Sequence, residues 1–491
     1  MTPMRPFLST VRASSATAVL VSTVVGALLF ASTPAFGNVA LTQVSSDPYT
    51  DAQAQHQTEV EPDTFRFGST IVSAFQVGRV FGGGASNIGW ATSTNGGANW
   101  TAGFLPGITG NAGGPYRQVS DPAVAFDTRH NVWLISSLGL NNAAGQVNVL
   151  TSRSTNGGLA WSNPITTATG SLDKNWIVCD NTATSPFYGN CYTQYDITSG
   201  NQVRMRRSTN GGLTWGPALA PSSGATGLGG QPVVRPNGTV IVPYRATNAS
   251  QIRSFRSIDG GASWRATVLV SSISHHTLAG SLRESPLPSA EIDSAGTVYV
   301  AWADCRFRSG CGRNDIVVSE STSETTWAAP YRVPIDATSS TVEHFVPGLG
   351  VDRSTAGGSA RLGLTYYFYP NSTCTAATCQ LTVGFISSTN GGTTWSAPTQ
   401  IAGPMSLSWL PNTSQGRMFG DYISTSVRPG GNAYTVIPVA TAPTGSTFHV
   451  PMVVPTGGLA ITGGARTASG SLTTTAPAPE SAVPVAPLTA R

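Results

Sequence analysis

The chain has 491 residues, of which only 10% are charged, and its formal net charge at pH 7 is +4. Soluble domains average about 25% charged residues, so this low share, together with 55 glycines, is typical of a protein with many turns and short strands. The small net charge gives no basic field of the kind that nucleic acid or an anionic membrane attracts. Neutral polar partners are favoured instead.

The first 37 residues have the organisation of an export signal. Arg5 and Arg12 precede an apolar stretch from Ala16 to Ala31, and small residues suited to cleavage follow at Ala35-Phe36-Gly37. A membrane anchor is the alternative, but the apolar run is short for a membrane span and Pro34 follows it. We therefore predict a signal peptide, a secreted, extracellular protein, and no membrane span once the signal is removed.

An eight-residue phrase recurs downstream of this segment. Its copies share an initial Ser, a turn containing two glycines and a terminal Trp, and they lie at Ser93–Trp100, Ser154–Trp161, Ser208–Trp215, Ser257–Trp264 and Ser388–Trp395. An eroded copy without the glycine pair lies at Ser319–Trp327. With that copy included, the phrases begin about 50–65 residues apart, which indicates one repeated supersecondary unit.

The phrase itself predicts a tight hairpin turn. Two adjacent glycines supply positive φ, and the Ser hydroxyl and the Asn or Asp side chain can bond to turn amides. The Trp can fold back onto the sheet. We interpret the phrases as turns that fasten two strands together, away from any chemistry.

Between these turns, an apolar strand opens each unit and a hairpin leads to the next strand. The seven openings begin at Glu61, Ser120, Asn175, Gly230, Glu284, His344 and Gly416. Turn signals such as Pro236-Asn237-Gly238 separate the alternating strands. Each unit is predicted to hold three strands, the recurrent turn and a fourth strand, which together form a propeller blade.

The predicted fold class is therefore all-β, a β-propeller of four-stranded antiparallel blades over residues 58–455. Seven openings favour seven blades, with the N-terminal segment 38–57 closing the ring through a strand around Val39–Gln43. Six blades are the alternative, in which the last segment completes the first sheet. Residues 456–491 are rich in Thr, Ala and Pro and are predicted to form a disordered tail.

The recurring phrase resembles the Asp box, also called the BNR repeat, of sialidases and related β-propellers, whose pattern is Ser-x-Asp-x-Gly-x-x-Trp. The resemblance covers about residues 58–455. Asp259 keeps the acid of the pattern, whereas the other four copies carry Asn95, Asn156, Asn210 and Asn390. The resemblance implies the fold more strongly than the reaction, because one propeller scaffold supports many activities.

Two openings resemble further segments of sialidase-like propellers. Lys174, the only lysine of the chain, lies in LDKNWIVCD, which is similar to the DK-x-W-I-x-x-D segment of bacterial members. The stretch Arg417–Ser424 is similar to an R-x-x-G-D-Y segment near the end of such propellers. A lysine retained at this one place suggests a positional need, although a lone surface lysine in an arginine-rich chain is the alternative.

Six cysteines fall into close pairs, and an exported protein is expected to oxidise them. Because loop-closure entropy favours neighbours, the expected disulfides are Cys179–Cys191, Cys305–Cys311 and Cys374–Cys379. A metal site is a weaker alternative, since no CxxC motif occurs and the histidines are scattered apart from His275-His276. No metal and no cofactor is predicted.

The innermost strands of a propeller line a central channel, and the loops that lead into them converge on one face. Polar residues at the openings are therefore candidates for the site. These candidates are Glu61, Asp63, Asp121, Lys174, Asp180, Glu284, Glu343, His344, Arg417, Asp421 and Tyr422.

The resemblance to sialidases implies roles for some of them. Sialidase chemistry needs three arginines for the sugar carboxylate, a Tyr nucleophile activated by Glu, and an Asp as general acid and base. The predicted catalytic residues are Asp121 as the acid, Tyr422 as the nucleophile, Glu284 or Glu343 as its base, and Asp421. The predicted substrate-binding residues are Arg66, Lys174, Arg245, Arg306 and Arg417. The Phe-Arg-Ile-Pro motif is missing, because Thr64–Ser69 has an arginine without a following proline, which weakens the case for sialic acid.

Three functions follow as hypotheses. The favoured one is a secreted sialidase-like glycoside hydrolase that cleaves terminal sugars from glycans, with exo-α-sialidase as its specific form, and it predicts two acids roughly 5–10 Å apart. A non-catalytic glycan- or cell-surface-binding propeller predicts exposed aromatic residues such as Trp176, Tyr244 and Trp302. A structural or protein-interaction propeller predicts an apolar plug. The expected partner is a glycan or glycoconjugate, and the expected state is a monomer.

Overall fold

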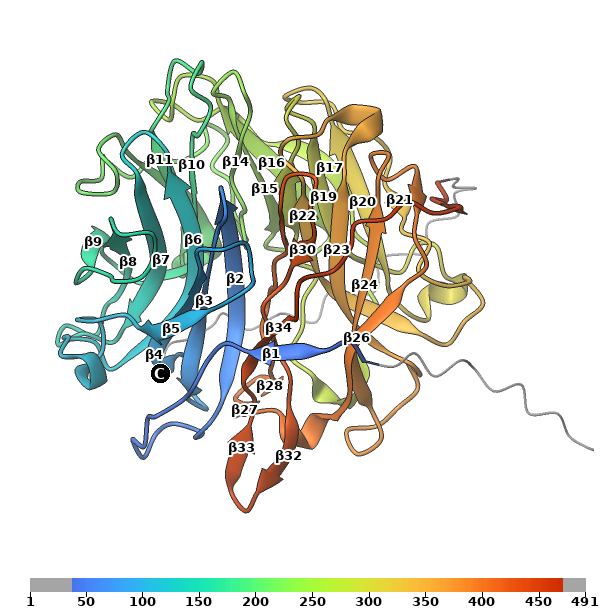
Figure 1. Cartoon of the computed structure of the whole chain (residues 1–491). Coiled ribbons are helices and arrows are strands. Elements are labelled where there is room, and N and C mark those ends of the chain that lie inside the picture. Colours follow the sequence, from blue (N-terminus) through green and yellow to red (C-terminus); the bar gives the residue numbers. More distant parts are fainter. Residues whose placement is uncertain (1–37, 471–491) are drawn as a thin grey trace, which may run out of the picture. The chain divides into compact units, whose positions relative to one another are not determined.

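The computed structural model describes residues 38–470 of the chain (Figure 1). The predicted signal peptide lies outside these residues, as does the predicted tail beyond residue 470. Within the described range, every regular element is a β-strand or a single-turn 3-10 helix, which confirms the all-β class. No helix in this range is both long and apolar enough to cross a membrane.

Residues 59–168 form two four-stranded antiparallel units, which a single pair between Ala85 and Val119 joins into one sheet. The first unit contains β2 (Glu59–Phe67), β3 (Thr70–Arg79), β4 (Ala85–Ser93) and β5 (Thr101–Phe104). The second contains β6 (Gln118–Asp127), β7 (Val132–Leu140), β8 (Val147–Ser154) and β9 (Ile165–Ala168). Every residue of β4, β6 and β7 is buried, so both faces of these strands are covered.

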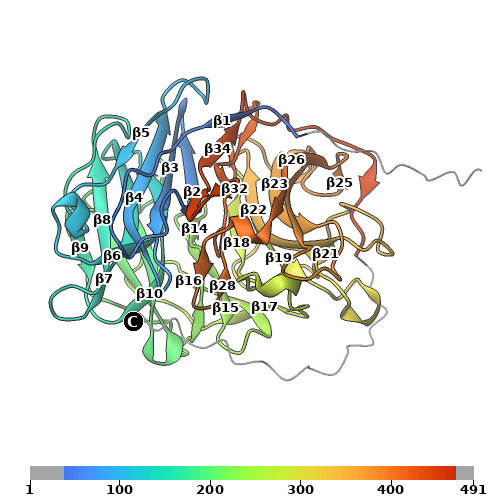
Figure 2. The same cartoon turned by 90° about the horizontal axis from the view of Figure 1, so that it is seen from below.

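Four more antiparallel units follow in sequence order, as Figure 2 shows from below. Their strands are β10 (Leu172–Cys179), β11 (Cys191–Ile197) and β12 (Gln202–Ser208); β13 (Gly227–Leu228), β14 (Val233–Val234), β15 (Val240–Ala246), β16 (Gln251–Ser257) and β17 (Val268–Ser272); β18 (Ser289–Ile292), β19 (Val298–Asp304), β20 (Asp315–Ser321) and β21 (Tyr331–Arg332); and β22 (Glu343–Val351), β23 (Leu362–Tyr369), β24 (Gln380–Ser388) and β26 (Thr399–Ser406). In the unit of β10 to β12, an isolated bridge between Met205 and Leu219 stands where a fourth strand is expected.

The final sheets combine both ends of the described chain. The strand β34 (Met452–Pro455) pairs on one side with β31 (Ile437–Pro438) and on the other with β1 (Leu41–Gln43), so the blue N-terminal strand lies beside the red β34 in Figure 1. Short pairs complete the strands: β29 (Ser426–Val427) with β30 (Ala433–Tyr434), β27 (Asn412–Thr413) with β28 (Gly416–Arg417), β32 (Thr441–Thr444) with β33 (Thr447–His449), and β25 (Thr394–Trp395) with β35 (Arg466–Thr467).

Six single-turn 3-10 helices lie in the connections of the described range. They are η1 (Gly110–Ala112), η2 (Ser199–Asn201), η3 (Ala279–Ser281), η4 (Ser309–Cys311), η5 (Gly357–Ser359) and η6 (Leu407–Trp409).

Residues 456–470, the described part of the segment predicted to be a disordered tail, are mostly exposed but are anchored at a few points. Leu459 and Ile461 are buried in the same apolar cluster as Phe345 and Phe419. The β35 strand pairs with β25 in the last of the recurrent turns. Composition alone misses this because two apolar side chains are enough to anchor a short segment to an existing core.

The first strands of the successive units lie side by side at the centre. Contacts run from β2 to β6 and on through β10, β14, β18 and β22 to β29, and β29 in turn contacts β2. Apolar clusters fill the spaces between neighbouring sheets; one of them packs Val72 and Trp90 of the first unit against Val124 and Trp133 of the second.

The five recurrent turns share one hydrogen-bond pattern. In the first, Gly97 N donates to Ser93 Oγ at 2.8 Å, Ser93 Oγ bonds Asn95 Oδ1 at 3.0 Å, and Asn99 N donates to Asn95 Oδ1 at 2.9 Å. The other four copies repeat these three bonds, the Asp259 copy included. An amide oxygen serves here as well as a carboxylate, which explains how Asn replaces the acid in four copies.

Three disulfides join Cys179 to Cys191, Cys305 to Cys311 and Cys374 to Cys379, which confirms the predicted pairing. Each closes a short loop, and the first also links neighbouring positions of β10 and β11. Disulfides of this kind are consistent with an oxidising, extracellular compartment.

Two glycines at the same position of different turns offer a matched test of how the turns contact neighbouring sheets. Gly157 and Gly391 have φ of +80° and +67°, but a Cβ on Gly157 meets nothing within 4 Å, whereas one on Gly391 lies 2.6 Å from the Gly357 carbonyl oxygen. We expect Gly157→Ala to lower the unfolding free energy by about 1 kcal/mol through left-handed backbone strain. Gly391→Ala should cost about 1–3 kcal/mol more, because a backbone atom must move. Chemical denaturation measures the unfolding free energy of both variants. Equal losses of unfolding free energy would contradict the close approach of Gly391 to Gly357.

Candidate functional site

Four central strands break their hydrogen-bond ladder at the same level. A register shift in β2, β6, β10 and β22 marks a bulge, and the bulged residues Glu61, Asp121, Lys174 and Val346 all have positive φ, between 44° and 55°. Each such residue costs about 1–3 kcal/mol, a strain that proteins concentrate at functional sites. Proline follows three of these four residues and lacks the N–H that a ladder would need.

The bulges bring charged side chains together around Lys174. Its Nζ lies 2.5 Å from Asp421 Oδ2, 3.6 Å from Glu61 Oε1 and 3.7 Å from Asp121 Oδ2. Arg283 Nη2 also lies 2.5 Å from Asp421 Oδ2. Glu61, Asp121, Lys174 and Asp421 are 1%, 3%, 5% and 9% exposed, so the ammonium is surrounded by acids away from water. We call these five residues the Lys174 cluster.

Neutral side chains connect the acids of the cluster. Gln76 Nε2 donates to Glu61 Oε2 and, at 3.1 Å, to Ser120 Oγ, which bonds Asp121 Oδ1 at 2.8 Å. Arg79 Nη1 donates to Gln76 Oε1 at 3.1 Å and so fixes the orientation of that amide. One oxygen is left over, since Asp121 Oδ2 has no hydrogen-bond partner.

The surroundings shift the pKa values of Glu61 and Asp421 in opposite directions. Burial raises the pKa of Glu61 from 4.5 to about 8, although Lys174 opposes the shift. Burial would also raise the pKa of Asp421, but Arg283 and Lys174 outweigh it and hold this pKa well below its usual range. Near neutral pH, Glu61 therefore carries a proton while Asp421 is ionised, and such a difference is how proteins assign acid and base roles to two carboxyl groups.

The Lys174 ammonium depends on the same balance. Burial alone would lower the pKa of Lys174, but the negative charges of Asp121 and Asp421, and that of Glu61 where it is ionised, raise this pKa above its ordinary value. The lysine therefore remains charged and acts as a fixed cation. Because each acid oxygen lies no more than 3.7 Å from this one nitrogen, no two of them are separated by more than twice that distance. Only the lower part of the carboxyl spacings of glycosidases, about 5–9.5 Å, lies below this upper limit.

Tyr422 and Trp176 stand beside the cluster. The Tyr422 hydroxyl donates to Pro122 O at 3.0 Å, its ring meets Trp176 edge to face at 5.0 Å, and Lys174 Nζ lies 5.7 Å from the ring centre. Burial raises the pKa of Tyr422 well above 10. A cavity of about 10 Å³ between Lys174, Trp176 and Tyr422 has space for roughly one water.

Glu284 and Arg245 lie apart from the ion pairs of Lys174. Glu284 Oε2 is 2.9 Å from His275 Nε2. Arg245 is buried, and its Nε and Nη1 atoms have no hydrogen-bond partner. The negative charges of Glu284 and Asp421 act on its guanidinium, but burial outweighs them and lowers the pKa of Arg245.

The other three predicted arginines do not join the cluster. Arg66 donates to Gly68 O at 3.1 Å, at the end of β2 that faces the recurrent turns rather than the Glu61 end. Arg417 Nη1 donates to Leu410 O at 2.7 Å.

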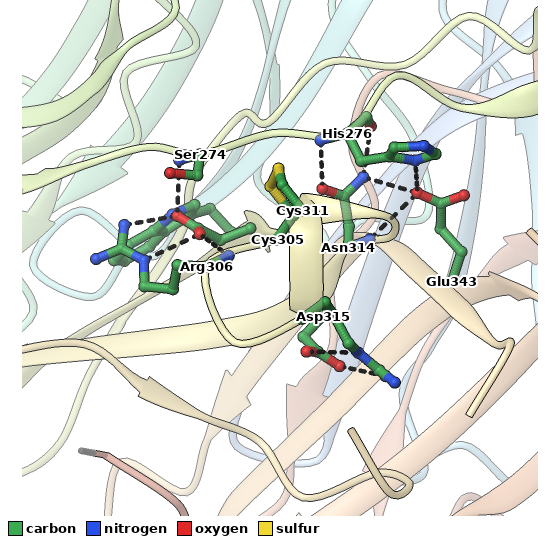
Figure 3. Close-up of a disulfide and its surroundings, with 11 residues drawn as sticks. Ser274, His276, Cys305, Arg306, Cys311, Asn314, Asp315 and Glu343 are labelled. Carbon is green, nitrogen blue, oxygen red and sulfur yellow. Dashed lines mark hydrogen bonds and ion pairs between the residues drawn. A yellow bond between two sulfur atoms is a disulfide. The ribbon is translucent and has the colours of Figure 1, made fainter. Parts of the chain in front are cut away.

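Arg306 lies next to the Cys305–Cys311 disulfide, where Figure 3 shows it on one side and Glu343 on the other. Its Nη2 pairs with Asp304 Oδ2 at 2.6 Å. Glu343 Oε1 accepts bonds from the backbone and side-chain nitrogens of Asn314 at 3.2 and 3.1 Å and lies 2.6 Å from His276 Nδ1. These contacts anchor the loop that the disulfide closes.

Sequence reasoning includes Glu61 among the candidates at the openings without assigning it a role, and it misses two contributors to the cluster region, Arg79 and Arg283. The acid-proline pairs Glu61-Pro62 and Asp121-Pro122 hold corresponding places in β2 and β6 and could have indicated Glu61. No local signal marks Arg283, which reaches Asp421 from a long connection.

Two groups in the described range have metal-ligand chemistry, and neither is free to bind. Asp127 lies near Cys179 and Cys191, but both sulfurs are in a disulfide. Asp315 and Asp336 lie near His344, but Arg308 and Arg332 pair with both carboxylates.

The aromatic side chains predicted to bind glycan are mostly covered. Tyr244 and Trp302 are buried, whereas Trp176 is half-buried.

No protein-family model matches the sequence, and no curated protein matches it either. Among solved structures, the fold is similar to an ulvan lyase, a polysaccharide lyase, with a TM-score of 0.50, 10% identity, and coverage of 86% of this chain and 96% of that one. A leech intramolecular trans-sialidase matches at TM-score 0.45 and 13% identity, over 66% of this chain and 67% of that one. The NanB sialidase of Streptococcus pneumoniae matches with a TM-score of 0.44 and 13% identity, over 85% of this chain and 70% of that one. The chain thus has a distant structural similarity to sialidases and other carbohydrate-active propeller enzymes.

The protonated state of Glu61 predicts a pH dependence of stability. Because its folded pKa of about 8 exceeds 4.5, its contribution to stability is complete below pH 4.5 and is lost as the pH rises through 8. One such proton changes the unfolding free energy by about 1.4 kcal/mol per pH unit. Denaturation titrations between about pH 5 and pH 8 measure this effect. The unfolding free energy of the wild type should fall as the pH rises, and Glu61→Gln should make that fall less steep.

Glu324→Gln is the control for this measurement, because Glu324 pairs with Arg256 in a partly exposed position, outside the Lys174 cluster. The unfolding free energy of this control should change with pH as steeply as that of the wild type. If the unfolding free energy of Glu61→Gln also changed with pH as steeply as that of the wild type, Glu61 would be ionised in the folded protein.

Proposed function

We propose that this chain is a secreted, monomeric, sialidase-like glycoside hydrolase with a seven-bladed β-propeller over residues 58–455. The continuous series of contacts from β2 through β29 and back to β2 supports seven blades. The pairing of β1 with β34 supports closure by the N-terminal segment 38–57. The substrate is a glycan, from which the enzyme removes terminal sugars.

One observation carries the proposal, namely the gathering of three acids, two of them on strained backbone, around one buried ammonium that is itself on strained backbone. Neither packing nor turn formation requires Glu61, Asp121 and Lys174 to adopt positive φ at the same level of neighbouring strands. The bulges do aim their side chains at one point, where carboxyl pKa values separate. Neighbouring carboxyl groups with different pKa values are what hydrolysis of a glycosidic bond uses.

The acids have different roles in this proposal. Glu61 carries a proton near neutral pH and acts as the general acid toward the leaving oxygen. Asp121, whose Oδ2 has no hydrogen-bond partner, accepts a proton from the attacking water as general base. Asp421 stays ionised beside Lys174 and Arg283 and stabilises the positive charge that develops on the sugar ring.

Exo-α-sialidase is the narrower form of the proposal, and it has less support. It requires Tyr422 as the nucleophile, but the Tyr422 hydroxyl donates to Pro122 O and burial raises its pKa. It also requires an arginine clamp, and Arg66, Arg306 and Arg417 lie outside the cluster. A sugar without a carboxylate fits Glu61 and Asp121 equally well.

A non-catalytic glycan-binding propeller is the second candidate, and the small cavity favours it. Only about 10 Å³ is open beside Lys174, and the cluster acids are buried. Hydrolysis therefore requires the covering segments, such as Gly229–Gln231 and Leu287–Pro288 that line this cavity, to move and admit substrate.

The assay offers the protein a fluorogenic sialoside and a panel of neutral fluorogenic glycosides. Glu61→Gln and Asp121→Asn should each lower kcat by about 10²–10⁴-fold, the usual contribution of one acid or base. Tyr422→Phe should matter only if the sialoside is the substrate. Glu324→Gln, a surface variant, should retain full activity. If the wild type releases no product from any glycoside, the binding propeller replaces the hydrolase.

A further inference from the structure

A second site lies at the edge of the sheet formed by β15, β16 and β17. It is a pocket of about 450 Å³, within the roughly 300–1,000 Å³ of small-molecule sites, and none of its lining residues belongs to the Lys174 cluster. The polar side chains that line it are those of Ser223, Thr226, Tyr244, Thr247, Asn248, Arg253 and Thr267.

The pocket contains one cation and no acid. Arg253 Nη1 donates to Gln251 Oε1 at 2.9 Å, and its Nη2 donates to Thr267 Oγ1 at 3.1 Å. Among residues 38–470, no carboxylate pairs with this guanidinium, and none lines the pocket. Its charge is therefore available to a ligand, and a guanidinium matches the oxygens of a carboxylate or sulfate.

The walls of the pocket are fixed before any ligand arrives. Thr267 N donates to Ser223 Oγ at 3.1 Å, and Val203 N donates to Ala225 O at 3.0 Å, so the segment around residue 224 is tied to two sheets. The Tyr244 side chain is 1% exposed and packs on Phe255 with the ring centres 5.7 Å apart. A rigid wall reduces the ordering cost of binding.

Strand geometry separates this pocket from the central region. Tyr244 and Arg245 are successive residues of β15, so their side chains point to opposite faces of the sheet. Tyr244 lines the pocket, whereas Arg245 is under the influence of Glu284, Asp421 and Asp196. A ligand in the pocket therefore does not contact the Lys174 cluster.

We propose that this pocket binds a saccharide that carries an anionic group, with Arg253 on the anion and the side chains of Thr226 and Asn248 on sugar hydroxyls. The combination of one unpaired guanidinium with hydroxyl and amide groups fits a uronic acid or a sulfated sugar better than a neutral one. The site stands apart from the proposed hydrolysis, so it binds its ligand in a protein whose cluster has been inactivated.

The test is isothermal titration of the mature chain with a glucuronate-containing tetrasaccharide, a sulfated tetrasaccharide and neutral cellotetraose. Arg253→Gln should weaken binding of the charged probes at least tenfold. Arg265→Gln removes a charge from an exposed position in the connection between β16 and β17, outside the pocket lining, and this variant should bind the probes as the wild type does. Asn248→Trp, on an exposed turn, fills the pocket and should abolish binding even if Arg253→Gln disturbs the fold.

Each outcome decides the proposal. Binding of one or both charged probes that both pocket variants weaken supports it, and the preferred probe identifies the anion as carboxylate or sulfate. Equal binding of cellotetraose, binding that survives both variants, or no binding of either charged probe would overturn it. A Glu61→Gln protein that still binds the charged probe separates this site from the proposed catalytic centre.

Discussion

The structure depends on the burial of one ammonium group. Lys174 is 5% exposed, and a lone charge at such a depth is strongly unfavourable unless acids surround it. Glu61 and Asp121 provide that environment from two units of one sheet, and Asp421 provides it from the connection between β28 and β29, so the ammonium links the first two units to the C-terminal part of the described chain. The positive φ at Glu61 and Asp121 is a local cost that these contacts offset.

The two ends of the sheets have different tasks. The recurrent turns lie where β3 begins and β4 ends, since Ile71 pairs with Ser93, the first residue of a turn. Glu61 lies near the start of β2, beside Gln76 at the far end of β3. Uniform turns at one end hold neighbouring strands in register, which leaves the other end free to vary its side chains. The candidate functional site and the recurrent turns thus lie at opposite ends of the same strands.

Features written in neighbouring residues could be predicted from the sequence, whereas those that depend on distant segments could not. The glycine pairs at Gly96-Gly97 and their equivalents specify a turn by themselves, and closely spaced cysteines specify their own partners. The sequence distinguishes Lys174 as the only lysine, but it does not indicate the partner Asp421, which is far away along the chain. Arg283 could not be found, because its position depends on how a long connection crosses the centre.

The most direct test is the unfolding free energy of Lys174→Met at neutral pH, with Arg256→Met as the comparison. Removing one member of a buried ion pair leaves Asp121 and Asp421 with less compensation, and the expected loss is about 3–5 kcal/mol. Arg256 pairs with Glu324 in a partly exposed position, and its removal should cost no more than about 1 kcal/mol. Equal losses from the two variants would contradict the account, because Lys174 would then not be the group that holds the central acids together.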